Sequence, residues 1–165
     1  MRWIWIDRFV SFESGKSAVA VKNLSLAEDH FADHFPGYPV MPAPLILEGL
    51  AQTGGILVGD ANGFTRNVIL AKIPKATFRR DALAGETLTY TATLEQMGEV
   101  GGLVVGTVHV GDELVAEAEI FFSHVDPSQA KELVGTDNFV FTGNLQKMLG
   151  LAKAAVKKSE ASGAA

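Results

Sequence analysis

Two titratable side chains in the first third of the chain could act as a base and an acid in proton transfer. His34 lies in a proline-rich stretch that should hold its side chain in place, and imidazole is well suited to take up a proton near neutral pH. Glu48 lies in a segment that is otherwise almost entirely apolar, so its carboxyl must be paired, neutral or directed into a cavity. A carboxyl that burial keeps protonated can serve as a general acid.

A third polar side chain supports this interpretation. Gln52 follows Glu48 by four residues, so on a helix the two share a face and the amide could orient the carboxyl. Taken separately, a single histidine or a single buried glutamate is more often a structural group whose hydrogen bonds are satisfied. The two together favour an acid–base couple.

The histidines also raise the question of a metal site. His30 and His34 are four residues apart, which is the spacing of two ligands on one face of a helix. Pro36 and Gly37 argue against a helix at this point, and the sequence contains no HExxH motif and no cysteine. We therefore expect no metal ion and no organic cofactor.

The stretch from residue 30 to residue 52 resembles the active-site region of the 3-hydroxyacyl-(acyl carrier protein) dehydratases of the FabZ/FabA type. The residues that match the family motif HFPxxPxMPG are His34, Phe35, Pro36, Pro39, Met41 and Pro42. The family's acidic residue follows its histidine by fourteen positions, as Glu48 follows His34, and a glutamate there is typical of the FabZ side. The resemblance continues through residues 75–88 and covers roughly residues 6–122.

This resemblance implies an α+β hot-dog fold, in which an antiparallel sheet wraps around a central buried helix. It implies a hydro-lyase that removes water from a 3-hydroxyacyl thioester to give a trans-2-enoyl thioester, in fatty-acid or related lipid biosynthesis. His34 would remove the α-proton, Glu48 would protonate the departing hydroxyl, and the backbone N–H of Ala43 would bind the thioester carbonyl. In the family the acid and the base come from opposite subunits, which implies a homodimer or a trimer of such dimers, with acyl carrier protein as the partner.

One departure from the motif concerns the carbonyl-binding position. The family usually has glycine after Met-Pro, whereas this chain has Ala43 followed by Pro44. Alanine still offers an N–H, but Pro44 offers none and restricts the backbone of Ala43. Either the carbonyl site persists with a slightly different geometry, which we favour, or the thioester binds differently.

Two further groups of residues are candidates for substrate and partner contacts. Side chains that could line an acyl tunnel, or equally could be ordinary core residues, are Phe31, Tyr38 and Met41. Positive side chains that could form a docking patch for an acidic carrier protein, or a solvated strand end, are Lys72, Lys75, Arg79 and Arg80.

The order of elements agrees with an α+β fold. The expected elements are a hairpin over 3–12 and 17–22, an irregular loop over 23–44, a buried helix over 45–58, a linker over 59–67, strands over 87–94, 103–110 and 114–122, and a helix over 145–156. A sheet with one helix leaves exposed edges, which favours dimerisation.

The length and the net charge of the chain limit the number of domains and the kinds of partner to expect. With 165 residues, we expect one hot-dog domain over residues 1–126 and an extension over 127–165 that contains a short helix and a disordered tail. A net charge of −5 argues against nucleic acid and membrane surfaces as partners. Neither a long apolar run nor an unbroken apolar N-terminus is present, so we expect a cytoplasmic protein.

Two rival functions remain at this point. A hot-dog thioesterase would use a carboxylate to activate water against the thioester, although a histidine in the HFP context argues against it. A noncatalytic subunit that binds the acyl carrier is the other rival. Ala43 with Pro44, and the C-terminal segment that lies outside the resemblance, keep it open.

Overall fold

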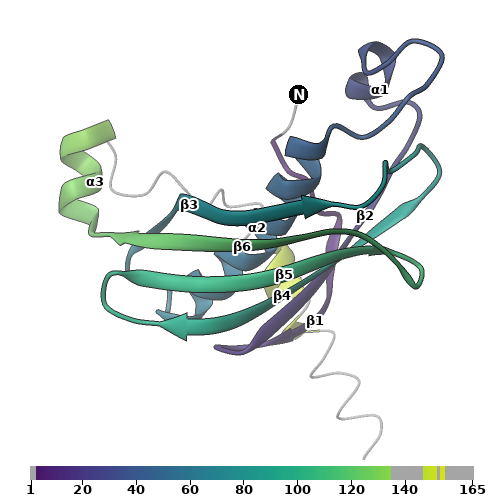
Figure 1. Ribbon diagram of the computed structural model, residues 1–165. Helices are drawn as coiled ribbons and strands as arrows, with labels where there is room; N and C mark the ends of the chain where they lie inside the picture. Colours follow the sequence, from purple (N-terminus) through teal and green to yellow (C-terminus); the bar gives the residue numbers. More distant parts are fainter. Residues whose placement is uncertain (1–2, 135–146, 152, 155–165) are drawn as a thin grey trace, which may run out of the picture.

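The computed structural model describes residues 3–134, 147–151 and 153–154. Within these residues the chain forms one six-stranded antiparallel sheet with a long helix across one face (Figure 1). The strands are β1 (Arg8–Glu13), β2 (Ser17–Asn23), β3 (Asn67–Phe78), β4 (Thr87–Met97), β5 (Gly101–Val110) and β6 (Glu113–Val125). The helices are α1 (Asp29–Asp33), α2 (Ala43–Ala61) and α3 (Pro127–Val134). This is the predicted α+β hot-dog arrangement.

Helix α2 is the central element of the fold. Nearly all of its side chains are apolar, so it is stable where protein surrounds it. Pro42 is the N-cap and Pro44 lies in the first turn, where a missing N–H costs no helical hydrogen bond. On the sheet side, Leu50 packs so closely on Gly106 that a Cβ there would lie 2.6 Å from it. The helix predicted over 45–58 is confirmed, and it extends slightly beyond this range at both ends, from Ala43 to Ala61.

The alternation predicted for β4 is also confirmed. Leu88, Tyr90 and Ala92 are fully buried, and the threonines between them are partly exposed. The strand order is β1-β2-β4-β5-β6-β3, so the central strands present one apolar face to α2. Strands β1 and β3 form the two edges of the sheet (Figure 1).

Strand β3 is the longest of the elements that the sequence prediction missed, the others being α1 and α3. It pairs with β6 from Asn67 to Phe78, with two register shifts near Lys72. Most of its side chains are exposed, and it contains Pro74, so it carries neither an apolar alternation nor a full set of donors. Such features are typical of an edge strand, where tertiary pairing overrides weak local preference.

Two boundaries near the N-terminus were also predicted wrongly. Strand β1 begins at Arg8, and residues 3–7 form an extended segment beside α2 instead of the first part of a hairpin. The loop predicted over 23–44 contains the short helix α1, which buries Phe31. Glu28, the residue before α1, is held by Lys22 at 2.6 Å and by the backbone N–H of Ser25 at 3.1 Å.

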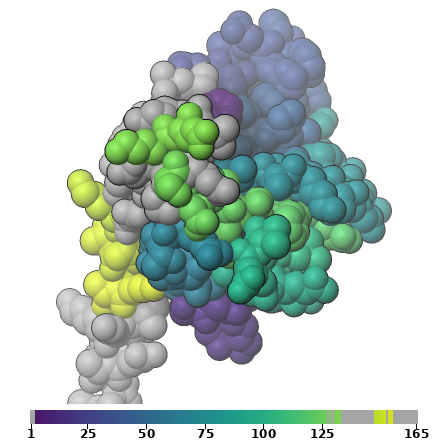
Figure 2. Space-filling model, turned by 90° about the vertical axis from the view of Figure 1, so that its left-hand side faces the viewer, coloured from purple at the N-terminus to yellow at the C-terminus, as the bar shows by residue number. Residues whose placement is uncertain are grey.

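The C-terminal region is described only in part. Residues 147–151 and 153–154 are helical, within the helix predicted over 145–156, and Leu149 joins the core. Lys153 forms an ion pair with Asp60 at the end of α2, and Figure 2 shows these yellow residues beside that end of the helix. The disordered tail predicted at the C-terminus lies outside the described residues. The division into 1–126 and 127–165 stays a prediction.

Candidate active site

His34 follows α1 and lies half-buried at the start of a tight loop. Its carbonyl accepts a hydrogen bond from the N–H of Val40 at 2.9 Å. Phe35 and Tyr38 exchange both of their backbone hydrogen bonds, at 3.1 and 3.0 Å. Gly37 completes this turn with a φ of +84°, a conformation that favours glycine. The proline-rich loop is therefore closed on itself, and these contacts fix the backbone at His34.

A cavity of about 420 Å³ opens beside the His34 loop. Its lining residues are His34, Phe35, Tyr38, Val40, Met41, Ala43, Ile46, Phe78, Arg79, Arg80 and Asp81. This cavity thus brings together the predicted base, the predicted carbonyl-binding residue and two predicted tunnel residues. Phe31, the third predicted tunnel residue, is instead buried in the core and is 3% exposed.

The start of α2 offers one backbone donor to this cavity. Ala43 is the first helical residue, and its N–H forms no backbone hydrogen bond within the described residues. Pro44 has no N–H, and the N–H groups of Leu45 and Ile46 both donate to the carbonyl of Pro42. The N–H of Ala43 is therefore the one available for an oxygen that develops negative charge, and the helix dipole adds to its effect.

Glu48 takes part in a hydrogen-bond network with the N-terminal segment. Its Oε1 accepts from the indole Nε1 of Trp3 at 3.0 Å and from Nε2 of Gln52 at 2.9 Å. Gln52 also accepts from the backbone N–H of Trp5 through Oε1, at 2.8 Å. The placement of Gln52 beside Glu48 follows from their spacing, whereas the contact with Trp3 has no signal in the sequence because 45 positions separate the partners.

Glu48 and His34 do not share a cavity within one chain. Ala43 and Ile46 face the His34 cavity, and at about 3.6 residues per turn Glu48 projects from roughly the opposite side of α2. Trp3, which contacts Glu48, does not line that cavity either. The single chain therefore presents the predicted base and the predicted acid on two different surfaces.

The four predicted docking residues fall into two groups: the two arginines form ion pairs, and the two lysines do not within the described residues. Arg79 pairs with Glu117 at 2.7 Å, and Arg80 pairs with Glu86 at 3.0 Å and with Glu113 at 2.8 Å. These contacts raise the pKa of Arg80, chiefly through the hydrogen bond to Glu86. The two arginines are thus largely neutralised beside the cavity.

The two lysines of that group differ from the arginines. Lys72 and Lys75 lie exposed on β3 and form no ion pair within the described residues. The ammonium of Lys72 lies 5.6 Å from the ring centroid of Phe121, a favourable cation–π contact. The two lysines therefore leave exposed positive charge on strand β3.

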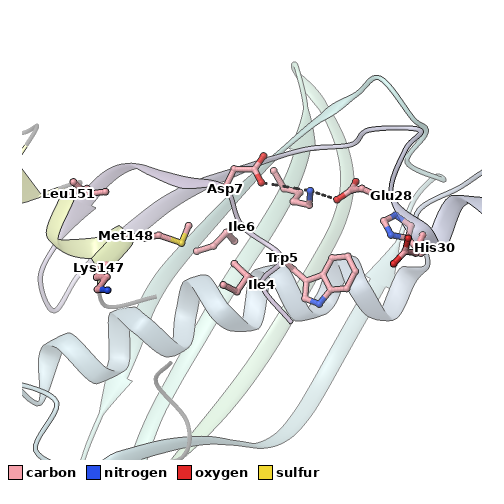
Figure 3. Close-up of a pocket in the computed structure, with 11 residues that line it drawn as sticks. Ile4, Trp5, Ile6, Asp7, Glu28, His30, Lys147, Met148 and Leu151 are labelled. Carbon is pink, nitrogen blue, oxygen red and sulfur yellow. Dashed lines mark hydrogen bonds and ion pairs between the residues drawn. The ribbon is translucent and has the colours of Figure 1, made fainter. Parts of the chain in front are cut away.

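A second cavity, of about 650 Å³, lies on the side of the N-terminal segment (Figure 3). Ile4, Ile6, Met148 and Leu151 contribute apolar walls, and the ion pairs of Lys22 with Asp7 and Glu28 close one end. Neither predicted catalytic residue lines it. Lys22, Asp7 and Glu28 thus pair with one another, and Glu28 also holds the loop before α1.

His30 lies at that second cavity. Its ring packs against Trp5 and Phe31, with centroids 5.5 and 4.3 Å away. Burial lowers the pKa of His30, so the neutral ring is favoured. Residue 30 does lie on a helix, contrary to the sequence argument, but the described residues contain no cluster of three side chains that could hold a metal ion.

Comparison with known proteins shows to which family the chain is related. Residues 3–119 match the FabA-like domain family, and this range includes His34, Ala43 and Glu48. The chain belongs to the FabA-like family. The resemblance inferred from the motif residues is thereby confirmed.

Curated relatives place this FabA-like protein close to FabZ. The 3-hydroxyacyl-(acyl-carrier-protein) dehydratase FabZ of Pelotomaculum thermopropionicum is 40% identical over 122 residues, which are 73% of this chain and 87% of that protein. The FabZ of Symbiobacterium thermophilum is 41% identical over 125 residues, which are 75% of this chain and 88% of that protein.

Solved structures of low sequence identity share the fold of this FabA-like protein. The conserved protein PA5202 from Pseudomonas aeruginosa aligns with a TM-score of 0.58 at 21% identity, over 72% of this chain and 87% of that chain. The dehydratase heterocomplex ApeI:P from Xenorhabdus doucetiae gives a TM-score of 0.56 at 17% identity, over 72% and 99% of the two chains. No helix among the described residues is long and apolar enough to cross a membrane.

Proposed function

We propose that this protein is a 3-hydroxyacyl-(acyl carrier protein) dehydratase, a hydro-lyase that forms a trans-2-enoyl thioester and water. The observation that carries the proposal is the combination of FabZ relatives at 36–41% identity with a histidine and a helix-start N–H on one cavity. The reaction belongs to fatty-acid or related lipid biosynthesis, and we place it in the cytoplasm.

In the proposed mechanism each group handles one atom of the substrate. The thioester carbonyl accepts a hydrogen bond from the N–H of Ala43, which stabilises negative charge as the α-proton leaves. His34 takes that proton, the bond from the β-carbon to oxygen breaks, and Glu48 protonates the departing hydroxyl to give water. A proton passing from His34 back to Glu48 then restores both residues.

The acid and the base of one site would come from two subunits. Within one chain Glu48 projects from the side of α2 opposite the His34 cavity, so an intramolecular couple would require a large rearrangement of the helix. We propose that His34 of one subunit works with the partner subunit's Glu48. Strand β3 supports this arrangement, since it is an edge strand of twelve residues with exposed Leu70 and Phe78.

The carrier protein would dock on the edge-strand lysines. Lys72 and Lys75 are exposed and unpaired within the described residues, and β3 leads to Phe78 at the His34 cavity. An acidic carrier would thus be attracted near the cavity, although the chain as a whole carries a charge of −5. Reversing the charge at Lys72 should raise KM for a carrier-bound substrate and leave a short free thioester unaffected.

The decisive experiment measures dehydration and hydration of carrier-bound acyl thioesters of several lengths. His34→Ala and Glu48→Gln should each lower kcat by about a hundredfold or more, because each removes one proton transfer. Matched controls are His109→Ala and Glu95→Gln, which lie outside the cavity and should stay within about twofold of wild type. Release of free thiol without loss of water would instead identify a thioesterase, and wild-type rates in both variants would refute the mechanism.

Mixed dimers test the two-subunit arrangement. A heterodimer of His34→Ala and Glu48→Gln chains, purified through two different tags, holds one intact site and one doubly altered site. It should recover about half of the wild-type activity, whereas each homodimer stays inactive. A heterodimer no more active than the homodimers would show that both groups of a site come from the same chain.

A further inference from the structure

The network around Glu48 determines which of its two carboxyl oxygens can carry a proton. The backbone N–H of Trp5 can only donate, so the Gln52 atom that lies 2.8 Å from it is the acceptor Oε1. The other end of the amide is therefore the donor Nε2. It lies 2.9 Å from Oε1 of Glu48 and 3.2 Å from the carbonyl of Trp3, which are both acceptors.

A second obligate donor meets the same carboxyl oxygen. The indole Nε1–H of Trp3 can only donate, and it lies 3.0 Å from Oε1 of Glu48. Two donors therefore occupy both lone pairs of Oε1, and a proton on this atom would oppose them. When Glu48 acts as the proposed general acid, the proton it donates therefore belongs on Oε2, which has no hydrogen-bond partner within the described residues.

The N-terminal segment is anchored well enough to hold this donor. Trp5 is 3% exposed, and its ring meets that of Trp3 edge to face with centroids 5.7 Å apart. Gly49, next to Glu48 on α2, lets the segment approach, because a Cβ there would lie 2.9 Å from the carbonyl of Trp5. Figure 3 shows Trp5 and Ile4 beside the helix. Trp3 itself is 60% exposed, and its side chain contacts the ring of Trp5 and the carboxylate of Glu48.

We propose that Trp3 is a positioning residue for the general acid: with Gln52 it holds Oε1 of Glu48 as an acceptor and leaves Oε2–H to protonate the departing hydroxyl. This inference rests on the proposed dehydratase function. In the reaction the Oε2–H bond breaks as the new bond to the leaving oxygen forms, and the negative charge that results is shared with Oε1. The hydrogen bonds from Trp3 and Gln52 strengthen as that charge develops.

The contact can be tested without activity, because the chain contains two tryptophans and therefore two indole N–H resonances. In the full-length protein labelled with ¹⁵N, Trp3→Phe identifies the resonance of Trp3. Glu48→Ala should move that resonance strongly and move the resonance of Trp5 much less. A Trp3 resonance at the same position in wild type and in Glu48→Ala would refute the hydrogen bond.

The role in catalysis needs a kinetic test that separates donation from packing. We compare Trp3→Phe with replacement of Trp3 by 3-benzothienylalanine, which keeps the shape of indole but lacks the N–H. Both should lower kcat by about tenfold with KM within about twofold, because the lost interaction is strongest in the transition state. Wild-type kcat with benzothienylalanine would overturn the proposal, since packing alone would then explain the effect of phenylalanine.

A double-mutant cycle shows whether Trp3 acts through Glu48. In the Glu48→Gln background, Trp3→Phe should change the residual rate by less than about twofold. The same tenfold loss in both backgrounds would mean that Trp3 acts elsewhere, and would overturn the proposal. Absence of dehydration by the wild-type protein would instead refute the dehydratase function, while the NMR result would still decide whether the contact exists.

Discussion

The surroundings of His34 and of Glu48 are built in different ways. The carbonyl of His34 is held by Val40, six residues along the same loop, and Gly37 shapes the turn between them. Glu48 is held by Trp3 across 45 positions of sequence, through a segment that itself depends on packing against α2. The base therefore sits in a locally determined loop, whereas the acid depends on a tertiary contact. The two sides should respond differently to changes of the same kind.

Replacing Gly49, beside Glu48, and Gly37, in the His34 loop, by alanine makes this difference measurable. The larger loss of stability is expected at Gly49. At Gly49 a Cβ would collide with the ring of Tyr90 and would lie 2.9 Å from the carbonyl of Trp5. Gly49→Ala should therefore lower the free energy of unfolding by about 3 kcal/mol, as overpacking of a rigid core does. It should also lower kcat, because the displaced segment carries Trp3, whose indole N–H donates to Glu48. Urea denaturation and the dehydration assay measure the two effects.

A control for Gly49 lies on the same helix. At Gly55 a Cβ would lie 3.3 Å from the edge of the Phe122 ring, a tight contact that a small ring movement relieves. Gly55→Ala should cost less than half as much as Gly49→Ala, because its closest contact is at 3.3 Å, whereas at Gly49 a Cβ would collide with the Tyr90 ring. Equal losses for the two variants would show that the N-terminal segment adds nothing special at Gly49.

On the base side the expected effect is smaller and purely conformational. Gly37 has a φ of +84° and nothing within 4 Å of a Cβ placed on it. Gly37→Ala should cost about 1 kcal/mol in free energy of unfolding, through backbone strain alone. Gly37→Asn should cost less, because asparagine tolerates this region better. A loss with asparagine as large as with alanine would contradict this explanation, and urea denaturation distinguishes the cases.

The smallest effect is expected at an ion pair beside the His34 cavity. Burial by itself would raise the pKa of Glu86, but the hydrogen bonds from Arg80 and from the N–H of Leu83 outweigh it and lower the pKa below its ordinary value of 4.5. A lowered carboxyl pKa adds stability that is present above the ordinary value and is lost as the pH falls through the folded-state value.

Glu86→Gln removes this contribution. It should lower the free energy of unfolding at neutral pH by about 0.5–1 kcal/mol, the usual size for a partly exposed pair. The difference from wild type should shrink as the pH is lowered through the acidic range where Glu86 becomes protonated. A difference that stays constant down to acidic pH would show that the ionised carboxylate is not its source, and urea titrations at several pH values decide this.

The sequence by itself determined the central helix, the strands β4 to β6 and the family. Their side chains alternate, or are apolar throughout, so local pattern and burial agree. The shape of the loop that holds His34 likewise follows from residues within the loop, namely its prolines and Gly37. The spacing of Glu48 and Gln52 predicted their contact, because four residues make one helical turn.

Only the tertiary structure decided how the acid is held and where it faces. Strand β3 forms because β6 offers it a partner, although Pro74 and its exposed side chains give little local preference for a strand. The contact of Trp3 with Glu48 depends on residues 3–7 leaving the predicted hairpin to lie along α2. Contacts between residues that are distant in sequence depend on how whole elements pack, and the pattern of one segment contains no information about its partner.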